Sequence, residues 1–145
     1  MEVGAVDANL LIYAYNKAAL QHLSAKRWLS QALGATTTLY LPWSSIQAFI
    51  RIITNERLFD PALTPEQATN VVESWLETQN THIIEPGPRY WTIFRSLLID
   101  YRINGPDVSD AHLAALALEH DLTLYSADAD FRRFRGLRVI NPLLG

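Results

Sequence analysis

Four aspartates stand at the ends of apolar runs in this chain of 145 residues: Asp7, Asp110, Asp128 and Asp130. The first follows the run 3–6, and the last two follow the run 122–125. If these runs are parallel strands of one sheet, their carboxyl ends share an edge, where open α/β sheets bind ligands. Carboxylates gathered there without a cation would repel one another and take up protons. The pattern therefore predicts Mg²⁺ or Mn²⁺ and phosphate chemistry.

Each aspartate also has a plain structural explanation. Asp7 could cap the helix that follows it. Asp107 and Asp110 could lie in the first turn of one helix, as its cap and a short version of the capping-box partner. Asp128 could begin a one-turn helix. A shared site explains the whole pattern with one cause, so we expect the carboxylates to converge.

The segments that must position these residues alternate between short strands and longer helices. The expected strands are 3–6, 39–41, 81–85, 122–125 and 137–140. The expected helices are 8–15, 22–32, 44–55, 65–76, 91–101 and 107–120. This alternation predicts βαβ units and a parallel five-stranded sheet with helices on both faces. Right-handed crossovers then give a three-layer α/β/α sandwich.

Two of the expected helices begin with capping signals. Ser44 or Ser45 can cap the helix after the second strand. Thr64 precedes Pro65, a residue that suits the first helical position, and Gln67 completes a capping box with Thr64.

The composition is that of one globular domain, residues 1–145, with 49% hydrophobic residues. The lack of cysteine excludes disulfides and thiolate metal sites and fits a reducing cytosol. A net charge of −3 is not that of a general nucleic-acid coat. The apolar stretches are too short to span a membrane, and no basic region precedes Val3. We therefore expect a cytoplasmic protein with no membrane partner.

Most basic residues are arginines, and several of them follow the last aspartates: Arg132, Arg133, Arg135 and Arg138. The planar fork of arginine suits phosphate. The alternative is a solvated helix end with Gly136 as its cap. In the same alternative, Asp130 pairs with Arg133 or with its own backbone.

Three motifs in chain order resemble those of the PIN-domain family. They are Val6-Asp7-Ala8-Asn9, Asp110-Ala111-His112-Leu113-Ala114-Ala115-Leu116-Ala117 and Tyr125-Ser126-Ala127-Asp128-Ala129-Asp130-Phe131. The segments 43–55, 86–87 and 139–143 support the resemblance, which covers essentially the whole chain. More narrowly, the chain resembles VapC-type toxins of bacterial toxin–antitoxin pairs. The resemblance implies a metal-dependent endoribonuclease that uses Mg²⁺ or Mn²⁺, an RNA substrate, a VapB-type antitoxin and a homodimer.

Carried over residue by residue, the resemblance implies that the catalytic and metal-binding residues are Asp7, Asp110 and Asp128. Asp130 matches a further acid that is less central, and Asn9 matches a polar residue near the first acid.

Other polar residues are accessory candidates. Ser126 belongs to the third motif, and we expect His112 to have a structural or RNA-contact role. The candidates for RNA binding are Arg51, Arg132, Arg133 and Arg135.

The chain departs from the family pattern at one position. The family has a glutamate in the helix after the second strand, where this chain has Ala48 with Gln47 beside it. Glu56 is a poor substitute, because eight residues along a helix is about 12 Å. Asp107 could compensate, because it lies three residues before Asp110. The departure supports an alternative function, a catalytically weakened PIN domain that binds RNA or antitoxin.

The helices expected within 8–32 and 44–55 carry more large apolar residues than one buried face needs: Tyr13, Tyr15, Trp28, Trp43 and Phe49. We expect part of this set to form a groove for an amphipathic antitoxin helix. An arginine beyond that helix could then reach the acids and replace the charge of the cation.

Overall fold

The structure, a computed structural model, describes residues 1–144. Its strands form one parallel five-stranded sheet in the order β3-β2-β1-β4-β5, which confirms the predicted sheet. The chain adds β2 and β3 on one side of β1, then returns to add β4 and β5 on the other. Ligands of such sheets bind outside the carboxyl ends at this point of reversal. The strands are β1 (Gly4–Val6), β2 (Leu39–Pro42), β3 (Thr81–Ile84), β4 (Thr123–Tyr125) and β5 (Val139–Ile140).

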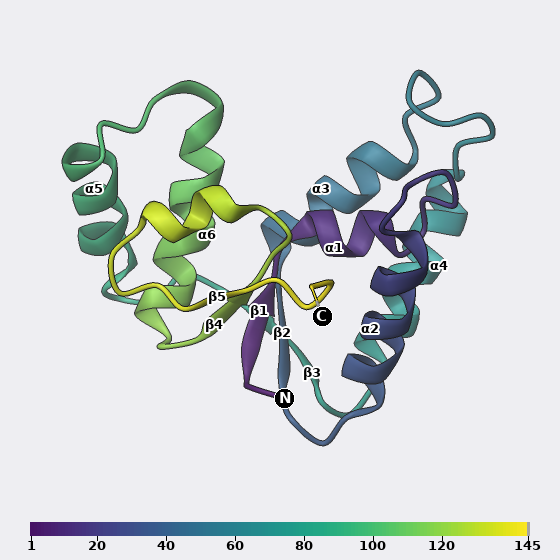
Figure 1. The fold of residues 1–145 in the computed structure, drawn as a ribbon, viewed down its shortest axis with the longest axis horizontal. Coiled ribbons are helices and arrows are strands. Elements are labelled where there is room, and N and C mark those ends of the chain that lie inside the picture. The colour runs from purple at the N-terminus through teal and green to yellow at the C-terminus, as the bar shows by residue number, and fades with distance from the viewer. Residues whose placement is uncertain (145) are drawn as a thin grey trace.

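Helices cover both faces of the sheet, so the three-layer arrangement is confirmed as well (Figure 1). One layer packs through a core that includes Phe49 and Trp75, and the other through a core that includes Phe131 and Phe134. The first layer holds α1 (Ala8–Tyr13), α2 (His22–Gly34), α3 (Trp43–Ile53) and α4 (Pro65–Leu76). The second holds α5 (Tyr90–Asp100), α6 (Val108–Glu119) and the 3₁₀ helix η2 (Ala129–Arg133), and a short 3₁₀ turn, η1 (Gly105–Asp107), leads into α6.

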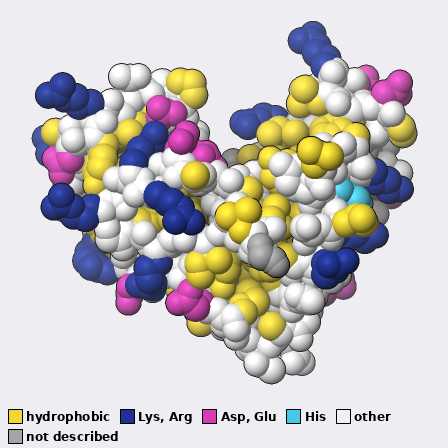
Figure 2. Space-filling model, in the orientation of Figure 1, with side chains coloured by type: hydrophobic (Ala, Val, Ile, Leu, Met, Phe, Trp, Pro, Cys, Tyr) yellow, Lys and Arg dark blue, Asp and Glu magenta, His cyan; other side chains and the backbone are white. Residues whose placement is uncertain are grey.

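The two layers extend past the carboxyl ends of the strands as separate lobes (Figure 1). The surface is hollowed between them, and acidic side chains gather on the wall of the left lobe (Figure 2). The fold therefore leaves an open notch at the edge of the sheet where ligands are expected.

The capping box at Thr64 is confirmed, whereas the cap expected at Ser44 or Ser45 is wrong. The Thr64 hydroxyl accepts from the Gln67 N–H at 3.1 Å, and the Gln67 side chain accepts from the Thr64 N–H at 2.9 Å. Helix α3 begins earlier, at Trp43, directly after the extended Pro42. Inside the helix, the buried Ser45 hydroxyl donates to the Val6 carbonyl at 2.7 Å. The serine thus joins α3 to the carboxyl end of β1.

Several element boundaries also differ from expectation. Helix α1 ends at Tyr13, and β5 is limited to Val139–Ile140. The last long helix is preceded by the turn η1, where Pro106 supplies an early helical position. Within residues 1–144, no helix has both the length and the apolar character to cross a bilayer.

Candidate active site

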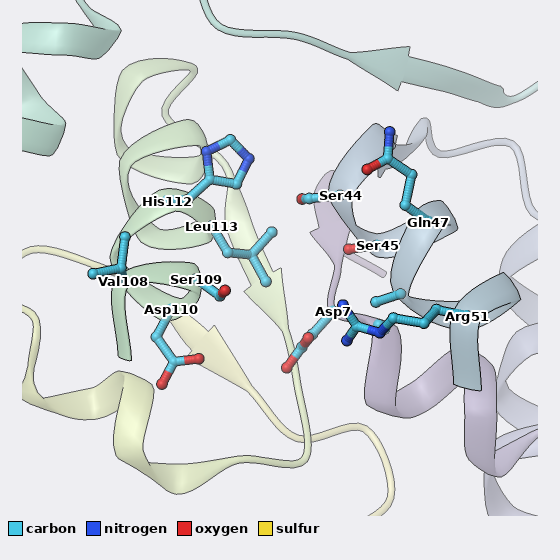
Figure 3. A pocket seen from close by; sticks show the side chains of 12 residues that line it. Asp7, Ser44, Ser45, Gln47, Arg51, Val108, Ser109, Asp110, His112 and Leu113 are labelled. Atoms are coloured by element: carbon cyan, nitrogen blue, oxygen red, sulfur yellow. The ribbon is translucent and has the colours of Figure 1, made fainter. Parts of the chain in front are cut away.

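A cavity of about 370 Å³ opens between α3 and α6, beside the carboxyl end of β1 (Figure 3). Asp7 at the end of β1 and Asp110 in the first turn of α6 point into its lower part (Figure 3). The lining residues are Asp7, Ala8, Ser44, Ser45, Gln47, Ala48, Arg51, Val108, Ser109, Asp110, His112 and Leu113. The structure therefore brings two of the three predicted acids to one cavity at the point of chain reversal.

Asp7 is the residue that precedes α1, but its side chain bonds to the segment after β4 rather than to the helix. Its backbone N–H donates to the Tyr125 carbonyl at 2.9 Å, which fixes it between β1 and β4. Its carboxylate accepts from the Ser126 hydroxyl at 2.7 Å and makes no side-chain capping bond to α1. Burial raises the pKa of Asp7, and the charge of Asp128 raises it further against the lowering effect of the Ser126 bond.

Among the acids of the site, Asp110 has the largest shift in pKa. Burial and then the charge of Asp128 raise its pKa from 3.8 to about 6, with a smaller raising contribution from Asp7. Arg133 opposes this shift, with its Nη2 3.4 Å from the Asp110 carboxylate. Asp107 makes no side-chain cap to α6, so the capping explanation of this pair is wrong. Asp110 thus faces the cavity with too little nearby positive charge to offset its burial and the charge of Asp128.

Ser126 links the first and third acids. Its hydroxyl donates to Asp7 and accepts from the Asp128 N–H at 3.0 Å. The Asn9 amide approaches the same hydroxyl at 3.4 Å, and the Asn9 side-chain oxygen accepts from the Ala127 N–H at 3.4 Å. The accessory residues Asn9 and Ser126 therefore hold the loop after β4 against the start of α1.

Asp128 also has a structural task. Its carboxylate accepts from the Asp130 N–H at 2.9 Å and caps η2, as the structural explanation of Asp128 proposed. The exposed Asp130 does not pair with Arg133, which turns to Asp110 instead. The negative charge of Asp128 still acts on Asp7 and Asp110, because it raises the pKa of both.

The carboxylates lie at one edge but not in the tight shell of a bound ion. Among residues 1–144, no three acidic or histidine side chains are close enough together to hold a metal. Their chemistry nevertheless fits Mg²⁺, which takes oxygen ligands and keeps several waters when few carboxylates bind it. Metal ligation by Asp7, Asp110 and Asp128 therefore stays a prediction.

The opposite wall of the cavity carries no acid. Ser44, Ala48 and Arg51 lie four and then three residues apart on one face of α3, and all three line the cavity. Position 48 thus faces the acids, as the family pattern requires, but offers only a methyl group. Glu56 lies beyond the end of α3 at Ile53. The side chain of Arg51 extends toward Asp7 (Figure 3).

The four arginines that follow the last aspartates have different positions. Arg133 lies against Asp110 and over the Phe134 ring, 4.8 Å from its centroid. Arg132 borders a small recess beside Asp128, and Arg135 is exposed. Arg138 pairs with Asp121 at 3.1 Å, before β4 and β5 begin. It therefore lies at the amino edge of the sheet, and a phosphate-contact role at the site is wrong for Arg138.

Sequence reasoning did not find the partner of His112. The Tyr90 hydroxyl lies 2.5 Å from His112 Nδ1, and burial lowers the pKa of this histidine. Nothing local in the sequence pairs the first residue of α5 with a residue in α6. Sequence reasoning also missed Ser44 as a site residue, although its spacing from Arg51 on one helix face was available as a signal.

A family model and several curated relatives match this chain over most of its length. A family model described as PIN domain matches residues 5–137. Ribonuclease VapC43 of Mycobacterium tuberculosis is 40% identical over 140 residues, covering 97% of this chain and 95% of that protein. Ribonuclease VapC37 of the same organism is 37% identical over 137 residues, covering 94% and 95%.

Solved structures share the fold at lower identity. VapBC2 from Rickettsia felis, bound to a promoter DNA fragment, superposes with a TM-score of 0.68 at 18% identity and covers 95% of this chain and 97% of that one. The sarcin–ricin loop cleaving toxin VapC20 of Mycobacterium tuberculosis superposes with a TM-score of 0.67 at 14% identity and covers 94% and 98%. With the family match and the curated relatives, the chain belongs to the PIN-domain family and, within it, to the VapC ribonucleases.

Proposed function

We propose that this chain is a Mg²⁺- or Mn²⁺-dependent endoribonuclease in which Asp7, Asp110 and Asp128 hold the ion. The observation that carries the proposal is the acidic cavity at the chain reversal, where burial and like charge raise the pKa of Asp7 and Asp110. When bound, the ion would neutralise the charge of a phosphodiester and favour ionisation of a water. The ribonuclease relatives favour this enzyme over the binding-only alternative.

The residues of the chain supply orientation and positive charge. Ser126 holds the carboxylate of Asp7 and the backbone of Asp128 through one hydroxyl, so it sets the spacing of these acids. Arg51 extends from α3 across the cavity and can bind the RNA phosphate beside Asp7 (Figure 3). Arg133 next to Asp110 can bind a neighbouring phosphate, and the exposed Arg132 and Arg135 extend the basic track.

Chelator-controlled cleavage of single-stranded RNA tests this function. Cleavage should stop with EDTA and return with excess Mn²⁺, and it should fall in the variants Asp7→Asn and Asp110→Asn. Asp121→Asn is the matched control, because that side chain is 91% exposed at the opposite edge of the sheet. Cleavage that survives both EDTA and Asp7→Asn would rule out the proposed metal site.

The partner that fits the family is a VapB-type antitoxin. A groove of about 750 Å³ between the loops after α1 and α3 is lined by Tyr15, Ile12, Ile52 and Leu58 among others. Of the large apolar residues expected to form a groove, Tyr15 lines it, whereas Phe49 is wholly buried in the core. An amphipathic helix can lay its apolar face there.

Antitoxin control is tested by measuring inhibition as Mn²⁺ is raised at constant ionic strength. An antitoxin arginine that reaches the acids should lose potency as the metal competes for them. Unchanged potency, together with an equally inhibitory arginine-to-alanine antitoxin series, would favour steric exclusion of RNA. The homodimer that the resemblance implies stays a prediction, which light scattering of the purified chain checks.

A further inference from the structure

The cavity between α3 and α6 has two chemically different halves. Asp7, Asp110 and Arg51 point into its lower half, and the neutral side chains of Ser44, Gln47 and His112 surround its upper half (Figure 3). Phosphodiester hydrolysis uses the charged half. The neutral half has no task in that chemistry, yet it belongs to the same cavity of about 370 Å³, within the roughly 300–1,000 Å³ typical of small-ligand sites.

His112 is fixed on the α6 wall by aromatic neighbours. The Tyr90 hydroxyl holds Nδ1 at 2.5 Å, and the rings of Tyr90 and Phe94 meet the imidazole edge-to-face at 5.5 and 6.5 Å. Because the Tyr90 hydroxyl occupies Nδ1, only the other ring nitrogen of His112 is left to face the cavity. Its second nitrogen, Nε2, points toward α3 and offers one directed hydrogen bond (Figure 3).

The α3 wall facing His112 offers an amide and a hydroxyl. Ser44 and Gln47 lie one helical turn apart, and within residues 1–144 neither side chain hydrogen-bonds to another residue. Gln47 can therefore present both a donor and an acceptor to a ligand. Ala48 beside it adds neither bulk nor charge, which keeps this wall open.

We propose that Gln47, Ser44 and His112 form a subsite for one unpaired nucleobase of the RNA, next to the phosphodiester held at the acids. This inference rests on the proposed function and names the part of the substrate that it selects. Proteins read single-stranded RNA by hydrogen bonds to the edges of splayed bases, and glutamine pairs with such edges through its donor and acceptor. A phosphate would instead go to Arg51 in the charged half.

The subsite makes cleavage selective for the base beside the cut. A set of short RNAs that differ only at the nucleotides flanking the cut is cleaved in Mn²⁺, and kcat/KM is compared between bases. The best base should exceed the worst by about tenfold or more. Gln47→Ala and His112→Asn should each reduce this ratio, and Tyr90→Phe should reduce it less because it only frees the imidazole.

The matched controls are Gln79→Ala and His82→Asn, two exposed residues away from the cavity, which should keep the wild-type ratio. Metal-dependent cleavage with the same ratio in Gln47→Ala and His112→Asn would overturn the subsite and leave the proposed function intact.

A binding measurement on the Asp7→Asn protein tests the subsite without catalysis. Trinucleotides of each base are titrated by fluorescence, and the preferred one should bind about tenfold more weakly after the added change Gln47→Ala. If no RNA is cut by the wild-type protein, the proposed function fails, and this titration still decides the subsite. Equal affinities with and without Gln47 would contradict it.

Discussion

Helix α6 carries a carboxylate near each end, and the two have opposite pKa shifts. Asp110 in the first turn has its pKa raised, and Glu119 at the last residue has its pKa lowered. The helix dipole favours negative charge at the amino end and disfavours it at the carboxyl end. The observed directions are the reverse, so local partners outweigh the dipole at both ends.

Glu119 shows what a satisfied buried carboxylate looks like. It is 6% exposed and accepts from the N–H groups of Gly87 and Arg89 at 2.7 and 2.9 Å. Burial alone would raise its pKa, but these two donors and the nearby charges of His120 and Arg89 together lower it. A Cβ at Gly87 would lie 2.7 Å from the Glu119 carboxylate, so only glycine permits this approach. Glu119 thus ties the loop after β3 to α6.

Asp110 shows the opposite condition. It has one partner, Arg133 at 3.4 Å, and the charge of Asp128 acts against it. At Asp7, burial raises the pKa by more than the Ser126 hydroxyl and the backbone N–H groups of Ala8 and Asn9 lower it. Perturbed carboxylates in a cavity are typical of functional sites, so the amino end of α6 fits the proposed cation site, whereas the fully bonded Glu119 at the other end holds the fold together.

The largest expected effect is a loss of RNA cleavage when an acid of the proposed cation site, near the amino end of α6, is changed. Asp7→Asn keeps the shape of the side chain and its acceptor for Ser126 but removes a charge from the proposed cation shell. Cleavage of RNA should fall by about 100-fold or more, while circular dichroism shows a retained fold. Asp128→Asn should lose activity too, and a wild-type rate in that variant would remove Asp128 from the site.

At the carboxyl end of α6, where Glu119 is fully hydrogen-bonded, a substitution should reduce the stability of the protein. Glu119→Ala leaves the Gly87 and Arg89 N–H groups without their acceptor, which should lower the free energy of unfolding by about 2 to 3 kcal/mol. Urea titration measures this loss. A lowered pKa stabilises the native state at higher pH, and this stabilisation fades as pH falls through the native pKa. The difference in the free energy of unfolding between the wild type and Glu119→Gln should therefore become smaller in acid. A difference that grows in acid would contradict the account.

Restoring an acid on the α3 wall should strengthen metal binding. Ala48 lines the cavity opposite Asp110, so Ala48→Glu adds a carboxylate where a cation would sit. The affinity for Mn²⁺, measured by calorimetry, should rise about tenfold. Equal affinity would mean that another acid already fills this place, and adding Asp107→Asn identifies whether Asp107 is that acid.

The smallest expected effect is the pH dependence of the metal-free protein. Because the pKa of Asp110 is raised from 3.8 to about 6, its contribution to stability is complete below pH 3.8 and is lost as pH rises through about 6. The free energy of unfolding should fall by about 1 to 2 kcal/mol from this group over that range, after allowance for solvent screening. Asp110→Asn should flatten this part of the profile, and an unchanged slope would contradict the shift.

The sequence predicted the fold and the edge of the sheet where the acids lie, because both follow from local patterns. Alternating apolar runs defined the strands, and the connections between parallel strands left few arrangements of the sheet. Asp7 is placed by its position directly after β1, and the Thr64 capping box by residues three apart.

What the sequence missed depends on contacts between distant segments. The local pattern favours Ser44 or Ser45 as a helix cap, yet the Ser45 hydroxyl donates to the Val6 carbonyl 39 residues away. Glu119 reaches Gly87 over 32 residues, and His112 reaches Tyr90 over 22, with no local signal for either pair. Arg138 follows the acids in sequence but lies at the amino edge of the sheet. The reason is that Arg138 directly precedes β5, which runs parallel to β4.

Thermal unfolding with and without Mn²⁺ tests most directly whether the amino end of α6 belongs to a cation site. A ligand that binds only the native state stabilises it, so millimolar Mn²⁺ at pH 7 should raise the Tm of the wild-type protein by about 3 °C or more. Asp7→Asn and Asp110→Asn should lose most of this shift, and Asp121→Asn should keep it. No shift in the wild type, or an equal shift in Asp7→Asn, would contradict the site.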